Sequence, residues 1–210
     1  MHIYAFGSIC RGEIDAASDI DLLAICEKDS PEIDPNRFSV YSLKRIREIW
    51  GRGNPFAWHL FAESTMLYSG DGSNPLTYLG RPAQYSCAVN DCTRFLKLLE
   101  HSFVQLRAGT PSPVFELSNA FLAIRNFATC FSLGRLSAGV FSRRSPRQLG
   151  VYSLTIEPNA FDVLERARML CTRGFGNTIN PTQVSIVISE YEIILEWMTN
   201  LLTEITKYES

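Results

Sequence analysis

The chain has 210 residues and a mass of 23.7 kDa, with 46% hydrophobic and 20% charged residues. These values are close to the averages for globular domains, and the length allows one large or two small domains. The net charge of -2 argues against extensive electrostatic binding of duplex nucleic acid, which usually uses a strongly basic surface. No signal-like N-terminus and no apolar run of the ~18 residues needed to span a bilayer are present, so we expect a cytoplasmic protein.

The first two elements that the pattern predicts are short buried strands. Residues 3–6 are strand-favouring and stop at Gly7, which predicts a tight turn. Residues 19–25 predict a second strand. Because residues i and i+2 of a strand point to the same face, Asp19 and Asp21 are expected to project together while Ile20 packs behind them.

Two parallel carboxylates repel each other, and a divalent cation relieves that repulsion. Magnesium in proteins is held by one or two carboxylates together with waters and substrate phosphates. A glycine in the preceding turn lets backbone amides approach a phosphate, and a serine hydroxyl can add a hydrogen bond. The sequence therefore predicts one site made of Gly7, Ser8, Asp19 and Asp21.

The run G-S-I-C-R-G-E-I-D-A-A-S-D-I-D-L-L, residues 7–23, resembles the signature of the polymerase-β-type nucleotidyltransferase superfamily. The resemblance implies a small mixed sheet flanked by helices, a nucleoside triphosphate, expected to be ATP, on Gly7 and Ser8, and Mg²⁺ (or Mn²⁺) on Asp19 and Asp21. It also implies transfer of a nucleoside monophosphate to an acceptor hydroxyl on a small molecule or a protein. Arg11 is a further candidate for binding phosphate.

The family pattern has a third acidic residue on a later strand, and the strand-like run 37–42 carries no acid. Possible replacements are Glu63 and Glu116, although Glu63 also fits a solvated carboxylate at a helix end, and Asp71 fits an ordinary turn. The missing acid, together with a chain that begins almost directly at the first strand, motivates an alternative. In that alternative the fold has lost catalysis and acts as a nucleotide-binding or antitoxin-like regulatory protein.

Helical periodicity dominates the rest of the chain. Glycines and prolines cluster over residues 70–82 and predict a connection between an N-terminal domain, 1–75, and a helical domain, 83–210. The overall class is therefore α+β, with an antiparallel bundle in the second half. The expected helices are 43–50, ended by Gly51, and then 88–106, 115–133, 160–171 and 181–208.

The bundle, especially the run F-E-L-S-N-A-F-L-A-I-R-N-F-A-T at residues 115–129, resembles the HEPN-type or substrate-binding helical domains that accompany such nucleotidyltransferases. The ribonuclease version of that fold needs a histidine after the arginine, and none follows Arg125, so a ribonuclease is rejected. Arg125 is expected either to pair with Glu116 or backbone carbonyls, or to contact the triphosphate or the catalytic aspartates. A homodimer is possible. His59 is expected to be a hydrogen-bonded core histidine.

Overall fold

The computed structural model describes residues 1–13, 20–26 and 33–209. The chain divides into two compact units, Met1–Ser86 and Cys87–Ser210, which are described separately below. The division falls a few residues after the glycine- and proline-rich segment in which the sequence places the connection.

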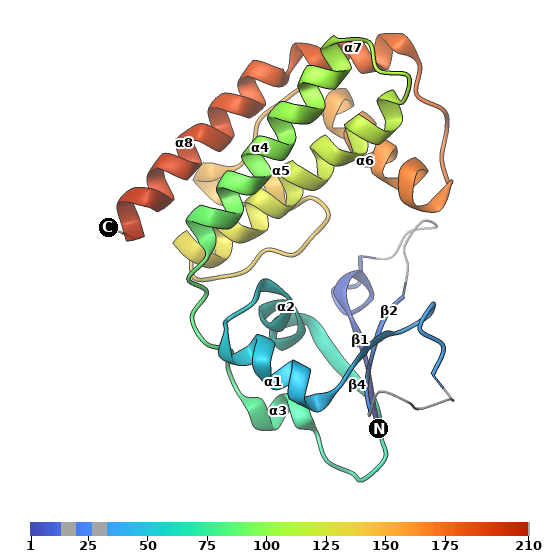
Figure 1. Cartoon of the computed structure of the whole chain (residues 1–210), viewed down its shortest axis with the longest axis vertical. Helices are drawn as coiled ribbons and strands as arrows, with labels where there is room; N and C mark the ends of the chain where they lie inside the picture. The colour runs from blue at the N-terminus through green and yellow to red at the C-terminus, as the bar shows by residue number, and fades with distance from the viewer. Residues whose placement is uncertain (14–19, 27–32, 210) are drawn as a thin grey trace. The chain divides into compact units, whose positions relative to one another are not determined.

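The described part of the first unit contains a mixed four-stranded sheet in the order β3-β2-β1-β4 (Figure 1). The central strand β1 pairs antiparallel with β2 and β4, while β2 and β3 run parallel. The two strands expected at residues 3–6 and 19–25 correspond to β1 and β2, and the run 37–42 contains β3. The bounds are β1 (His2–Phe6), β2 (Asp21–Ile25), β3 (Ser39–Tyr41) and β4 (Ser64–Ser69).

Three short helices, α1 (Leu43–Gly51), α2 (Pro55–Glu63) and α3 (Pro75–Leu79), complete this unit. Each begins where the side chain of a polar residue accepts a hydrogen bond from the backbone of the first turn, which satisfies an otherwise unpaired N–H. These capping residues are Ser42, Asn54 and Asn74.

One core holds the sheet and the helices together. Alternate residues of β1 and β2 point to the same face and bury apolar side chains against α1 and α2, as the period of two requires. The tyrosine of β1 also fixes α3, because its hydroxyl donates to Asn74 Oδ1 at 2.9 Å. The core is formed by Tyr4, Phe6, Leu23, Ile25, Ile46, Ile49, Trp50, Ala57, Leu60 and Leu76.

The helix expected at 43–50 is α1, and it ends at Gly51 as expected; the left-handed residue after it is Gly53, with φ of 61°. Two local expectations in this unit are wrong. Ile20 does not pack behind the aspartates, since 60% of it is exposed just before β2 begins. Residues 70–82 are more than a connection, because they contain α3, whose start follows from an asparagine cap before Pro75.

The second unit consists of helices, as the sequence predicts. The helix α5 contacts α4, α6 and α8 and is buried on most of its surface. This explains why its hydrophobic residues do not form a single stripe. The bounds are α4 (Ala88–Arg107), α5 (Pro113–Arg135), α6 (Pro158–Arg173), α7 (Pro181–Ser189) and α8 (Tyr191–Glu209).

The expectation of one long helix over 181–208 is wrong, because α7 ends at Ser189 and α8 begins at Tyr191. The Ser189 hydroxyl donates to the carbonyl of Ile186 at 2.8 Å. Such a bond competes with the regular backbone ladder, but Ser185 makes the same kind of bond to the carbonyl of Pro181 within α7, so it does not by itself end the helix. Neither proline nor glycine lies at the break, so the sequence pattern gives no stop signal there.

The fold class is therefore α+β, a small mixed sheet followed by helices, as expected. Among the described residues, no helix is both long and apolar enough to cross a membrane. Arg125 on α5 is partly buried and donates from Nη2 to the carbonyl of Phe141 at 3.1 Å, which agrees with the carbonyl-bonded alternative.

Candidate functional site

The candidate site is centred on the turn that follows β1. Gly7 has a φ of 76°, a left-handed conformation that glycine adopts without steric cost. It starts the 3-10 helix η1 (Gly7–Ile9), and the backbone N–H groups of Cys10 and Arg11 then donate to the carbonyl of Gly7. Ser8 is half-buried in this turn. The local chain therefore folds as the glycine and serine predict.

Asp21 lies against this turn from the neighbouring strand. It pairs with Phe6 in the β1–β2 register, which places its carboxylate beside Gly7. A Cβ on Gly7 would be 2.8 Å from Asp21 Oδ2 and 3.8 Å from Cε1 of His59. The backbone of the turn, one carboxylate and one imidazole thus meet at a point where only glycine leaves room. Asp19, the other predicted acid, lies outside the described residues.

Arg11 and His59 are joined by the carboxylate of Glu63. The Glu63 Oε2 atom pairs with Nη1 of Arg11 and lies 2.9 Å from Nε2 of His59. The second carboxylate on Arg11 is Glu13, whose Oε2 accepts a hydrogen bond from Nε at 2.9 Å. The side chains of Arg11, His59 and Glu63 are only 19%, 16% and 13% exposed, so water screens their charges less than at the surface.

One expectation for Glu63 is a solvated carboxylate at a helix end. The residue does end α2, but its burial and its contacts with Arg11 and His59 contradict the solvated state. His59 packs edge-on against Phe6, with ring centroids 5.5 Å apart. The contact between His59 and Glu63 could have been predicted from their four-residue spacing, which puts both side chains on one face of a helix.

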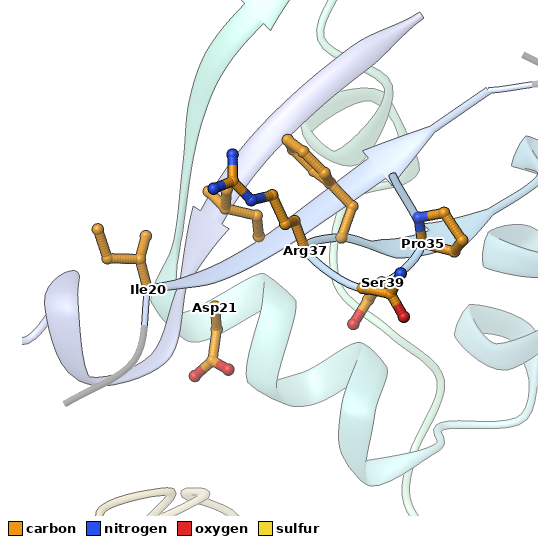
Figure 2. A pocket seen from close by; sticks show the side chains of 8 residues that line it. Ile20, Asp21, Pro35, Arg37 and Ser39 are labelled. Carbon is orange, nitrogen blue, oxygen red and sulfur yellow. The ribbon is translucent and has the colours of Figure 1, made fainter. Parts of the chain in front are cut away.

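The strand β3 carries no acid, as the sequence predicts. Leu23 pairs with Ser39 at the start of β3, and Arg37 lies in the turn before this strand, where its backbone N–H donates to the carbonyl of Asp34. Arg37 and Asp21 both line an open surface pocket of about 530 Å³. In Figure 2 their side chains point in opposite directions from the sheet, with Arg37 above the ribbon of β2 and Asp21 below it.

Glu116, the other possible acid, lies on α5 in the second unit and is buried. In the part of the chain that the structure describes, no group of three or more His, Cys, Asp or Glu side chains could hold a metal ion. Magnesium does not need such a group, since one or two carboxylates suffice when substrate phosphates and waters complete its shell. An exposed aspartate beside a glycine turn fits that donor set.

Comparison with known proteins finds a family model over the part of the chain that contains the candidate site. The family model described as the nucleotidyltransferase domain matches residues 2–67, less than half of the chain. The matched range begins with β1 and ends within β4, so it includes the turn, Asp21 and the Arg11–Glu63–His59 cluster. No curated protein matches the chain.

Proposed function

We propose that residues 2–67 form a site that transfers a nucleoside monophosphate from a nucleoside triphosphate to an acceptor hydroxyl. One observation carries the proposal: Gly7 is left-handed and lies so close to Asp21 that a Cβ at position 7 would be 2.8 Å from Oδ2 and would force the carboxylate to move. A backbone turn facing a carboxylate suits a triphosphate neutralised by a divalent ion. The nucleotidyltransferase match over the same residues supports this reading.

Within this proposal, Asp21 and Asp19 hold Mg²⁺ or Mn²⁺. The ion, when bound, neutralises charge on the phosphates and on the leaving pyrophosphate. The N–H groups and hydroxyl of Gly7 and Ser8 bind the β- and γ-phosphates. Arg11 has five N–H donors and uses two of its nitrogens on carboxylates, so donors remain for a phosphate oxygen.

The acceptor hydroxyl must lose a proton as the new phosphate ester forms and pyrophosphate leaves. A carboxylate on β3 would be placed to take that proton, but β3 has none among its residues Ser39–Tyr41. We assign no base within the described residues. The helical unit, which resembles HEPN-type domains in sequence, is proposed to bind the acceptor, a small molecule or a protein.

The test is calorimetry with each nucleoside triphosphate in the presence of Mg²⁺ or Mn²⁺, with ATP as the expected ligand. The wild type should bind, and the Asp19→Ala, Asp21→Ala double variant should not bind in the presence of the ion. Transfer of α-labelled monophosphate is then measured against hydroxyl compounds and against the protein itself. Failure of the wild type to bind any triphosphate would falsify the proposal.

A second candidate is a nucleotide-binding or antitoxin-like regulatory protein without turnover. The absence of an acid from β3 and the ion pairs of Glu63 with Arg11 and His59 favour it. The same experiment separates the two candidates. Binding with the divalent ion and no transfer to any acceptor supports the regulatory protein, whereas transfer to any hydroxyl excludes it.

The same proposal includes a cytoplasmic location and a homodimer for this protein. Light scattering during size-exclusion chromatography, with and without nucleotide, measures the mass of the particle in solution. A mass near twice 23.7 kDa is expected for the dimer. A mass of one chain at every concentration argues against it.

A further inference from the structure

We propose that Glu63 is a positioning residue that holds Arg11 and His59 in place around the Gly7–Ser8 turn, and that it is not the missing catalytic acid. This inference rests on the proposed function and deepens it. The observation behind it is that a single atom, Glu63 Oε2, contacts both the guanidinium of Arg11 and the imidazole of His59.

The position of Glu63 in the fold suits such a role. It is the last residue of α2 and directly precedes β4, so both a helix and a strand fix its backbone. Its first partner, Arg11, follows the turn η1, whose carbonyls accept the backbone N–H of Arg11. Its second partner, His59, lies one helical turn earlier on α2. One carboxylate therefore ties the phosphate turn to α2.

Within the cluster, His59 and Arg11 are the residues near the Gly7 turn, and Glu63 acts on the turn through them. His59 Cε1 would be 3.8 Å from a Cβ on Gly7, the position that Asp21 Oδ2 approaches to 2.8 Å. Arg11 is the cation nearest in sequence to the turn. A carboxylate whose Oε2 atom already contacts two side chains of its own unit is poorly placed to reach an acceptor hydroxyl.

The expected effect of removing the Glu63 charge follows from the electrostatic cost of breaking the cluster. The three side chains are mostly buried, and among the described residues the other carboxylate on Arg11 belongs to the more exposed Glu13, which is 44% exposed. Removing one member of a buried pair costs more than breaking a surface pair, because the remaining charge loses its compensation. Arg11 then samples other rotamers. The cost of restoring the rotamer that contacts phosphate reduces the free energy of phosphate binding.

The experiment measures the Kd of MgATP by calorimetry for Glu63→Gln, Arg11→Gln and the double variant. Glu63→Gln should weaken binding about tenfold, with a raised KM and an unchanged kcat in any transfer assay. In the Arg11→Gln background the same change should alter Kd less than about twofold, because Glu63 acts through Arg11. Equal, additive losses, or a fall in kcat alone, would overturn the assignment.

Glu48→Gln is the matched control, since Glu48 is a helical glutamate paired with Arg45 at 3.0 Å but outside the site. Its Kd should equal that of the wild type. If Glu63→Gln does not fold, Glu63→Asp replaces it, because the shorter side chain keeps the charge and withdraws it from both partners.

Amide spectra separate this inference from the proposed function. If the wild type binds no triphosphate, the proposed function fails. The comparison of ligand-free spectra still decides whether Glu63 positions the Gly7–Ser8 turn. Glu63→Gln should shift the amide signals of Gly7, Ser8 and Arg11, whereas Glu48→Gln should not. Unshifted signals at the turn in Glu63→Gln would overturn the positioning role.

Discussion

Gly7 and Asp21 approach each other so closely that a single added methyl group would collide with the carboxylate. The two residues come from adjacent strands, and the β1–β2 register, Phe6 opposite Asp21, sets their proximity. The contact joins two halves of the sequence motif that are separated by thirteen residues.

Gly7→Ala should abolish binding of a triphosphate and lower stability by about 1 kcal/mol or more, since the change adds both a collision and a strained left-handed residue. Gly12→Ala is the control, because Gly12 also has a positive φ, 72°, but a Cβ there would meet no atom of the described residues within 4 Å. Calorimetry and thermal unfolding measure both effects. Equal loss of binding in the two variants would show that strain, and not the contact with Asp21, is responsible.

Asp21→Asn should remove binding of a triphosphate in Mg²⁺ while leaving the unfolding temperature nearly unchanged, because the side chain lies at the exposed start of β2. The amide keeps the shape but loses the charge that a hard cation requires. Asp162→Asn, at an exposed position of α6, is the matched control. Binding that survives in Asp21→Asn would remove this residue from the proposed metal site.

Much of this architecture follows from local patterns. The apolar run before Gly7 and the helical periodicity after residue 87 depend on neighbours in sequence, and the corresponding strands and helices are present. The cluster of Arg11 with Glu63 could not be predicted in the same way, because its members are 52 positions apart and meet only when α2 packs on β1. The break between α7 and α8 at Ser189 could not be predicted from the sequence either, because serine occurs both within helices and at bends.

The roles predicted for the site residues stay predictions. Gly7 and Asp21 come together in the fold, while Asp19 lies outside the described residues. The sequence left Glu63 open between a replacement for the third acid and a solvated carboxylate, because burial depends on contacts that composition does not reveal. Its pairing with His59 was detectable from the four-residue spacing alone.

Asp71 should make the folded protein more stable at neutral pH than in acid. Hydrogen bonds from the side chain and backbone of Ser73 hold the pKa of Asp71 at about 2, below its ordinary value of 3.8. A carboxyl with a lowered folded-state pKa stabilises the fold fully above 3.8, and this contribution is lost as pH falls from there through about 2.

The measurement for Asp71 is thermal unfolding of wild type and Asp71→Asn between pH 2 and 6. The wild type should unfold at the higher temperature at pH 6, and the difference should shrink toward pH 2. A carboxyl titration followed by NMR gives the pKa directly. A difference in unfolding temperature that is constant over this range would exclude the linkage.

Gly134→Ala should destabilise the helical unit by about 1–3 kcal/mol, the usual cost of overpacking a core. Gly134 lies on α5, and a Cβ there would be 2.4 Å from Cβ of Ala88 on α4 and 2.8 Å from Cδ1 of Ile205 on α8. Gly51→Ala at the end of α1 is the control: its Cβ meets nothing, and alanine should stabilise by up to about 1 kcal/mol. Urea unfolding followed by circular dichroism measures both changes. If Gly134→Ala unfolds at the wild-type midpoint, α4 and α8 do not pack against α5 this tightly.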